Sequence, residues 1–376
     1  MSIDKGENVN FSVKRDSLLQ ALSIVSHAAC GTTSIPALQC ILVEAYGSEL
    51  TLTCNNLEIA ITSTITADIR DNGKFLIDSR LFCDIIRKIE GDSVSISKEG
   101  STVNIQDSYS NFDISSIPLQ DFPDLPQNVN EFSITLPQVA LKELIKATSF
   151  AAAADNGKVI LTGCFIEISG KNIKFVAMDG YRLAIRKKTL EEAYDDRKLI
   201  IPAKALTELS KAFSDEDEEI VINGSSKNIE FSFNGIRFFS RLIEGEYIDY
   251  EKIIPSDFES SFNVSRGKME ACISRATLII TNDSVKCPVV FDHSSKSMLC
   301  CENQIGKSEE EIPISKTTGT LPTIAFNHRY VIDAIRACPE EELIFKFNIS
   351  VSPCVITSAE KEDKYTYIIL PVRMRS

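Results

Sequence analysis

The chain has 376 residues and a mass of 41.7 kDa, enough for two or three domains that each bury a core. Hydrophobic residues make up 43% and charged residues 25%, which excludes a largely disordered chain. No apolar run approaches the ~20 residues of a membrane helix, and the polar N-terminus lacks the apolar segment of a secretory signal, so we expect a cytoplasmic protein.

Two kinds of helix signal recur along the chain. The first follows a short strand that begins at Phe11, Phe132 or Phe262, and its apolar residues have helical spacing. The second is a strand, then a breaker or capping residue, then a helix. The breaker or capping residues are Ser79, Pro202 and Asn327. The six predicted helices cover residues 14–29, 79–89, 136–153, 202–214, 265–279 and 327–338.

Each helix of the second kind carries two basic residues seven positions apart. Seven residues make nearly two turns, so both charges project from one face. The pairs are Arg80 and Arg87, Lys204 and Lys211, and Arg329 and Arg336, with spacings of 124 and 125 residues between copies. A repeat of ~125 residues is too long for a solenoid unit, so the sequence predicts three similar domains in tandem.

Short runs of alternating polarity with Gly, Asn and Ser punctuation lie between the helices and predict antiparallel meanders. We therefore expect an α+β class in which each domain has two helices packed on antiparallel sheets. Proline-containing connectors at 121–130 and 249–257 place the domains at residues 1–127, 128–256 and 257–376.

Charge is divided unevenly between the helices and the rest of the chain. The predicted helices hold fourteen basic and six acidic residues, a net of +8, whereas the whole chain carries −13. The remainder therefore carries −21. Lys and Arg are good helix formers, but so is Glu, so propensity alone does not explain the bias. A basic helix layer on an acidic protein favours a surface that faces a polyanion.

Four segments together resemble one known family. They are NLEIAI (56–61), SIPLQDFPDLP (116–126), KFVAMDGYRLA (174–184) and YTYIILPVRM (365–374). In this order along the chain they are similar to the bacterial β sliding clamps, the β subunits of DNA polymerase III. The resemblance implies a clamp fold of three domains, closed by two chains into a six-domain ring with helices around the hole. It also implies a non-catalytic processivity factor that encircles duplex DNA without sequence specificity and needs no cofactor or metal.

The resemblance further implies partners and sites. The partners are double-stranded DNA, the DNA polymerase III α subunit and other polymerases, the clamp loader complex, and mismatch-repair and ligase-type proteins. The partner-peptide pocket would include Leu161, Gly180, Tyr181, Arg182, Leu183, Lys252, Ile253, Ile368, Leu370, Pro371, Val372, Arg373 and Met374. The DNA-facing residues would be Arg80, Arg87, Lys142, Lys146, Lys158, Lys204, Lys211, Arg266, Arg329 and Arg336. The dimer interface would join Phe112 and Ile114 of one chain to Arg275, Leu278 and Ile279 of the other.

Alternatives remain open at this stage. An enzyme would need a catalytic motif, and the sequence has no GxGxxG, P-loop or GxSxG pattern; a structural turn explains Asp179 beside Arg182. A scaffold that does not bind DNA would share the fold without needing cations at equivalent positions. Ile368 and Leu370 would also suit a buried edge strand, and Phe112 would suit an ordinary core position. Solvated loops are the simplest reading of the acidic runs at 214–219 and 309–311.

Overall fold

The computed structural model describes residues 8–125, 130–154, 157–214, 218–280, 288–359 and 364–373. Two compact units divide the chain: the first holds residues Met1–Val139 and Glu208–Leu242, the second Ala140–Thr207 and Ile243–Ser376. These limits differ from the predicted domain limits because two of the sheets each take strands from two sequence repeats. Met374 and the last two residues lie outside the described residues.

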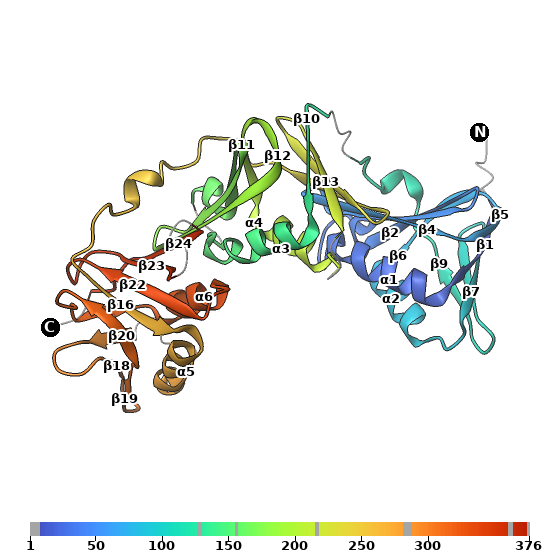
Figure 1. Ribbon diagram of the computed structural model, residues 1–376. Coiled ribbons are helices and arrows are strands. Elements are labelled where there is room, and N and C mark those ends of the chain that lie inside the picture. Colours follow the sequence, from blue (N-terminus) through green and yellow to red (C-terminus); the bar gives the residue numbers. More distant parts are fainter. Residues whose placement is uncertain are drawn as a thin grey trace. The chain divides into compact units, whose positions relative to one another are not determined.

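The first unit contains two antiparallel sheets, shown in blue to yellow in Figure 1. Sheet 1 has the order β5 (Asp68–Asp71), β1 (Val9–Lys14), β7 (Ser93–Glu99), β8 (Thr102–Gln106), β9 (Asn111–Ser115). Sheet 2 has the order β10 (Phe132–Pro137), β13 (Glu219–Gly224), β14 (Asn228–Phe233), β15 (Ile236–Arg241), β4 (Ile59–Thr66), β3 (Glu49–Asn55), β2 (Cys40–Tyr46), β6 (Gly73–Asp78).

Helices α1 (Arg15–Val25) and α2 (Ser79–Lys88) pack against each other and against β2, β3, β4 and β6 (Figure 1). Their buried faces are apolar, with Leu18 and Leu22 on α1 and Phe82 and Ile86 on α2 fully buried. The apolar spacing that predicted the helices is therefore the face that builds the core.

The second unit also contains two antiparallel sheets. Sheet 3 has the order β11 (Gly163–Met178), β12 (Arg182–Pro202), β24 (Tyr365–Ile369), β23 (Cys354–Ser358), β22 (Glu342–Phe347), β16 (Ser260–Ser265), β20 (Ile314–Thr318). Sheet 4 has the order β19 (Lys307–Glu311), β18 (Met298–Glu302), β17 (Val289–Asp292), β21 (Ile324–Phe326). Helices α5 (Arg266–Ala276) and α6 (His328–Ala337) pack together beside these sheets (Figure 1).

The two remaining helices, α3 (Gln138–Lys146) and α4 (Ala203–Lys211), contain the points where the chain passes between units. The six predicted helices are confirmed, and each is shorter than predicted. The predicted helices are too long because 3₁₀ turns such as Ser26–Ala28 and Thr277–Ile279 continue the apolar spacing past the α-helical end.

Two local predictions were wrong. Asp78 rather than Ser79 caps α2, because its carboxylate accepts a hydrogen bond from the Leu81 N–H at 2.7 Å. Glu309–Glu311 do not form a loop but belong to strand β19, where Arg275 binds Glu310 at 2.8 Å. Asn327 caps α6 as predicted, accepting from the Arg329 N–H at 3.0 Å.

Candidate functional site

The turn between β11 and β12 is built by Asp179. Its carboxylate accepts hydrogen bonds from the backbone N–H groups of Tyr181 at 2.9 Å and Arg182 at 3.1 Å. Gly180 lies between Asp179 and Tyr181 at φ 91°, a conformation that favours glycine. The expected structural turn explains Asp179, and nothing in this geometry makes it a catalytic acid.

Arg182 ties this turn to α6. Its guanidinium binds Asp179 at 3.1 Å, Asp333 of α6 at 2.6 Å and the Phe150 carbonyl at 2.6 Å. The guanidinium carbon also lies 4.5 Å from the centre of the Tyr330 ring. Only 13% of the Arg182 side chain is exposed. Its hydrogen-bonding groups are thus engaged inside the chain, so Arg182 positions the turn and has little left for a partner.

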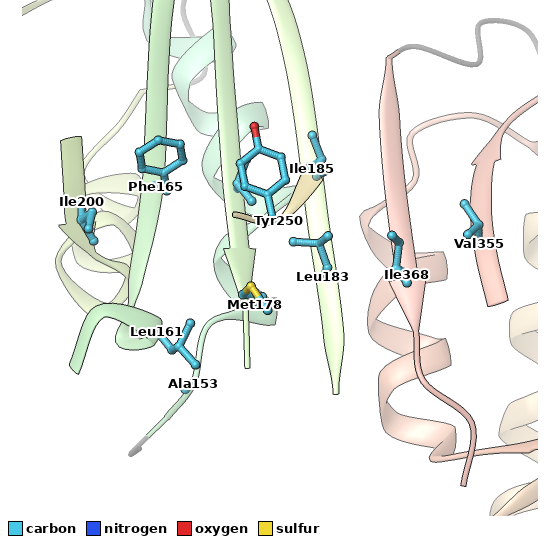
Figure 2. Close-up of a cluster of buried hydrophobic side chains, with 11 residues drawn as sticks. Ala153, Leu161, Phe165, Met178, Leu183, Ile185, Ile200, Tyr250, Val355 and Ile368 are labelled. Atoms are coloured by element: carbon cyan, nitrogen blue, oxygen red, sulfur yellow. The ribbon is translucent and has the colours of Figure 1, made fainter. Parts of the chain in front are cut away.

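An apolar row crosses four neighbouring strands of sheet 3. Met178 of β11 pairs with Leu183 of β12, Leu183 pairs with Ile368 of β24, and Ile368 pairs with Val355 of β23. Figure 2 shows these side chains on successive strands. Because residues opposite one another in adjacent strands share a face, the row forms a continuous apolar floor.

This floor belongs to a larger group of buried side chains, which we call the apolar cluster (Figure 2). Its members are Ala153, Leu161, Phe165, Val176, Met178, Leu183, Ile185, Ile200, Tyr250, Val355 and Ile368. Six hydrophobic side chains that are only partly buried pack against it: Ile160, Ile243, Tyr247, Ile248, Ile254 and Phe258. Partly exposed apolar side chains around an apolar floor are the surface that a peptide with apolar anchors needs.

One side of the cluster is the segment that follows Tyr247, and Lys174 of β11 holds it in place. The Lys174 ammonium lies 2.8 Å from Glu167, 3.0 Å from the Tyr250 hydroxyl and 3.2 Å from Glu251. Burial lowers the pKa of Lys174, but these hydrogen bonds raise it more, so its pKa is well above the ordinary value. The network fixes Tyr250 against β11, where its ring contacts Phe165 at 6.2 Å between centres.

The structure brings some predicted pocket residues together and not others. Leu161, Leu183 and Ile368 are members of the apolar cluster. From the 249–257 connector, Tyr250 belongs to the cluster and Ile254 packs against it. Lys252 of the same connector is 83% exposed and binds Asp249 at 2.7 Å. Tyr181 is 62% exposed and stacks on Tyr330 with ring centres 6.3 Å apart.

The C-terminal segment leaves the sheet at the floor of the cluster. Ile368 is not in an edge strand, because β24 lies between β12 and β23. The Leu370 N–H then donates to the Tyr181 carbonyl at 2.8 Å, and the Val372 N–H donates to the Ala325 carbonyl at 2.8 Å. Leu370 and Pro371 are half-buried, while Val372 and Arg373, like Ile253, are exposed. Met374 lies outside the described residues.

Sequence reasoning missed Phe165, Met178, Ile185, Val355 and their neighbours in the cluster. A signal was present, because Met178 lies two residues from Val176 and Ile185 two residues from Leu183. Period-two spacing places each pair on one face of its strand. The face itself follows only from the register between strands.

The predicted DNA-facing cations on α2, α4 and α6 divide into two sets. We call Arg80, Lys204 and Arg329 the first-turn cations, since each is the second residue of its helix. All three are exposed, and none forms an ion pair with another described residue. The N-terminal end of a helix carries partial positive charge, so a cation there is unfavourable by ~0.3–1 kcal/mol. Their presence is not explained by stability.

We call Arg87, Lys211 and Arg336 the last-turn cations. Each binds an acid: the distances are 2.8 Å from Arg87 to Asp84, 2.9 Å from Lys211 to Glu208, and 2.7 Å from Arg336 to Glu270. The C-terminal end of a helix favours cations. A structural role therefore accounts for these three residues more readily than for the first-turn cations.

The other predicted DNA-facing residues lie on α3, α5 and the loop before Val159. Lys142 is half-buried and Lys146 exposed on α3, and Lys158 is exposed. Arg266 begins α5 and lies 3.9 Å from Glu341.

The predicted dimer residues lie beside two sheet edges that have no further strand among the described residues. Strand β9, with Phe112 and Ile114, ends sheet 1, and strand β19 ends sheet 4. Phe112 is 37% exposed, so it is not a core residue of this chain. Near β19, Leu278 is 80% exposed, Ile279 is half-buried, and Arg275 binds Glu310 of the strand.

Metal and redox chemistry find no support in the described part of the chain. Its ten cysteines are all free, and no group of three or more His, Cys, Asp or Glu side chains could hold a metal ion. Burial raises the pKa of Cys40 to about 11 and of Cys164 to about 12, so these thiols stay protonated and unreactive near neutral pH. No helix in the described ranges is long and apolar enough to cross a membrane.

Known proteins match the chain along nearly its whole length. Domain models of the DNA polymerase III beta subunit match in order: the N-terminal domain at residues 9–126, the central domain at 135–249 and the C-terminal domain at 251–373. A beta sliding clamp of Staphylococcus aureus is 32% identical, and one of Staphylococcus epidermidis 30% identical, each alignment covering 97% of this chain and 99% of the relative.

Solved structures agree with this assignment. A DNA polymerase sliding clamp from Bacillus subtilis superposes with a TM-score of 0.92 at 26% identity, covering 98% of this chain and all of that one. The beta subunit from DNA polymerase of Streptococcus pyogenes gives a TM-score of 0.91 at 28% identity, covering 97% and 100%. The fold is thus the three-domain clamp fold of the DNA sliding clamps.

The chain belongs to the DNA polymerase III beta subunit family, the bacterial β sliding clamps. It is a non-catalytic processivity factor of DNA replication.

Proposed function

We propose that two copies of this chain close into a ring that encircles duplex DNA and tethers the replicative polymerase to it. The observation that carries this proposal is the set of first-turn cations, Arg80, Lys204 and Arg329. They recur at the same helix position in three repeats, exposed and unpaired among the described residues, where the helix dipole disfavours them. A scaffold that ignored DNA would gain nothing from these positions.

Sliding requires weak contacts. Phosphate contacts position a protein on DNA but carry no sequence information, and each one is salt-sensitive. A few separate cations can hold a duplex centred without gripping it, while retention comes from closure. A tether of this kind raises the effective concentration of a bound polymerase at the primer end.

Charge reversal tests the proposal. Arg80, Lys204 and Arg329 are changed together to Glu, and the matched control changes Arg87, Lys211 and Arg336 to Glu. The first variant should keep or gain thermal stability, because a carboxylate in the first helical turn is favourable by ~0.3–1 kcal/mol. It should nevertheless lose loading onto nicked circular DNA and processive synthesis. The control should lose thermal stability, because it breaks the ion pairs that Arg87, Lys211 and Arg336 make with Asp84, Glu208 and Glu270.

Retention is compared on nicked circular and linearised DNA, since a closed ring slides off free ends. Wild-type retention and processivity in the first variant would overturn the DNA-facing assignment and favour a scaffold that does not bind DNA.

The topology supports closure by a second copy. Strand β15 ends the middle repeat and pairs with β4, and β24 ends the last repeat and pairs with the first residues of β12. Strands β4, β12 and β19 begin at Ile59, Arg182 and Lys307, which are 123 (182 − 59) and 125 (307 − 182) residues apart and therefore lie at equivalent points of the three repeats. In both cases the last strand of one repeat thus pairs with this equivalent strand of the preceding repeat. Strand β9 ends the first repeat and β19 is the equivalent strand of the last repeat, and both are sheet edges. We infer that β9 of one copy pairs with β19 of the other, with Phe112 and Ile114 facing Leu278 and Ile279.

The variant Phe112→Asp should convert the dimer into a monomer, because a charge would have to be buried at the new strand pair. Tyr109→Asp, in the neighbouring loop where Tyr109 is 84% exposed, is the matched control. Sedimentation velocity measures both. A dimer that persists in Phe112→Asp would place the interface elsewhere.

The apolar cluster supports the partner site. Its floor and partly exposed rim suit short peptides with apolar anchors, as expected for the DNA polymerase III α subunit, other polymerases, the clamp loader complex, and mismatch-repair or ligase-type proteins. We place this activity in the cytoplasm, where a bacterial chromosome is copied.

A further inference from the structure

A hollow of about 400 Å³ lies in the second unit between α3 and α6. Its lining comes from α3, the segment after it, β12 and the end of α6, and it shares no residue with the apolar cluster. Pockets that take small ligands occupy ~300–1,000 Å³, so the hollow is large enough for one.

Arg186 is the unusual member of this lining. It belongs to β12, is only 6% exposed, and lies opposite Tyr365 of β24, with its guanidinium carbon 5.6 Å from the centre of that ring. The Nη1 atom is buried without a hydrogen-bond partner, and the side chain forms no ion pair in the described part of the chain. A buried guanidinium with no anion beside it is costly, so its retention calls for a negatively charged ligand.

The other charged groups of the hollow do not neutralise Arg186. Lys146 lines it from α3, is exposed, and has no ion pair among the described residues. The remaining charged side chains are engaged with partners: Asp333 with Arg182 at 2.6 Å, Glu143 with Lys188 at 3.5 Å, and Arg336 with Glu270 at 2.7 Å.

Two further groups near the hollow, Glu340 and Cys338, do not supply a counter-ion to Arg186. Glu340, buried just beyond α6, binds Lys364 at 3.1 Å, and its second oxygen has no hydrogen bond, so it does not bond to Arg186. Burial raises the pKa of the Cys338 thiol, which lines the hollow, to about 12, so that thiol contributes no charge. The cations Arg186 and Lys146 are left without a counter-ion of their own.

We propose that this hollow is a phosphate site, with Arg186 binding the phosphate oxygens from inside and Lys146 binding them at the rim. Guanidinium and ammonium groups together match the charge of a phosphate, and the planar guanidinium fork matches its geometry. A phosphodiester within a duplex carries sugar on both sides and does not fit against a side chain that is 94% covered. A free pyrophosphate, or the terminal phosphate of a strand, has exposed oxygens that can enter.

Calorimetric titration of the full-length protein tests this assignment. The probes are pyrophosphate and a dinucleotide with or without a 5′-phosphate. Arg186→Met keeps the apolar stem and removes the charge, and it should weaken binding about ten-fold or more; Lys146→Gln should weaken it several-fold. Lys187→Gln is the control, because it removes an exposed cation of the same strand β12 that does not line the hollow, and its affinity should match the wild type.

The probes also identify the source of the phosphate. Binding of pyrophosphate shows that a free phosphate enters, and binding of only the 5′-phosphorylated dinucleotide shows that a strand end does; either result supports the site. Absence of binding by every probe at millimolar concentration overturns it, as does unchanged affinity in Arg186→Met. Should that variant fail to fold, Lys146→Gln decides, and unchanged affinity there overturns the proposal. These readouts do not involve ring closure, so they leave the DNA proposal to its own test.

Discussion

The chain has two junctions at which one repeat pairs with the next. The antiparallel strand pairing is the same at both junctions, but the side chains differ. In the first unit β4 pairs with β15 from Ile59 opposite Ser240 to Ser63 opposite Ile236. In the second unit β12 pairs with β24 from Arg182 opposite Ile369 to Arg186 opposite Tyr365. The register therefore places Ile59 and Ser63 where the second junction has Arg182 and Arg186.

The surroundings of the two junctions also differ. The first junction has an open hollow of about 1410 Å³ beside α1 and β4, and Ser63 is part of its lining. Near this junction His27, just after α1, binds Glu208 of α4 at 3.0 Å. The second has a hollow of about 400 Å³ with a buried arginine, and an arginine that binds two acids. Strand pairing makes both junctions, but only the second has the side chains of the phosphate site proposed above.

The largest effect should come from the side chains that tie helices at each junction. Arg182→Ala should lower the free energy of unfolding by about 3 kcal/mol, because it leaves the Asp179 carboxylate, which is 13% exposed, without its partner. His27→Ala should cost under ~1 kcal/mol, because the His27 side chain is 36% exposed. Urea denaturation measures both. Equal losses would mean that the two junctions are tied with similar strength.

The next effect separates the apolar cluster from its surroundings. Ile248→Glu puts a charge among the partly buried side chains and should weaken binding of a partner-derived peptide about ten-fold or more. Lys252→Gln is the matched control in the same connector, and it should bind normally because Lys252 is 83% exposed and outside the cluster. Fluorescence anisotropy with a labelled peptide measures the affinities. A larger loss in Lys252→Gln would restore that residue to the site and remove Ile248 from it.

The smallest effect concerns the network around Lys174. Burial raises the pKa of Glu167, but Lys174 and Lys198 lower it more, so it lies below its ordinary value of 4.5. A carboxyl with a lowered pKa stabilises the fold above that ordinary value and loses the contribution as pH falls through the folded-state pKa. The contribution of this network to the free energy of unfolding should therefore be constant near neutral pH and fall in acid below about pH 4.5. Lys174→Met should lower the free energy of unfolding by less than ~1 kcal/mol and flatten this acid-side decline, and urea denaturation at a series of pH values measures both effects. An unchanged pH profile in Lys174→Met would mean that the network does not stabilise the fold.

The sequence allowed a good prediction of the fold because its signals are local and repeated. Apolar spacing located the helices, and alternation with turn residues located antiparallel strands. The prediction failed at details set by competition between neighbours. Helix α2 is capped by the carboxylate of Asp78 and not by Ser79. Residues Lys307 to Glu311 pair with β18, although their acidic composition is typical of a loop.

The site was predictable only where one motif contained it. Leu183 and Ile368 lay in recognised segments, whereas Phe165, Ile200 and Val355 come from three strands, β11, β12 and β23, that the register of sheet 3 brings together. A single sequence does not specify that register. Arg186 carried no signal at all, because burial is what distinguishes it from the basic residues beside it.

The unpaired edges β9 and β19 have a consequence for assembly. In the proposed pairing of β9 with β19, the two edges of a chain differ, so each copy that joins uses one edge and leaves the other edge for the next copy. The oligomer stops growing only when the free edge of the last copy pairs with the free edge of the first copy. Whether the two edges meet depends on the angle between successive repeats. A substitution that changed that angle without weakening the strand pairing would produce open filaments from well-folded chains. Its first sign in solution would be light scattering that rises with protein concentration.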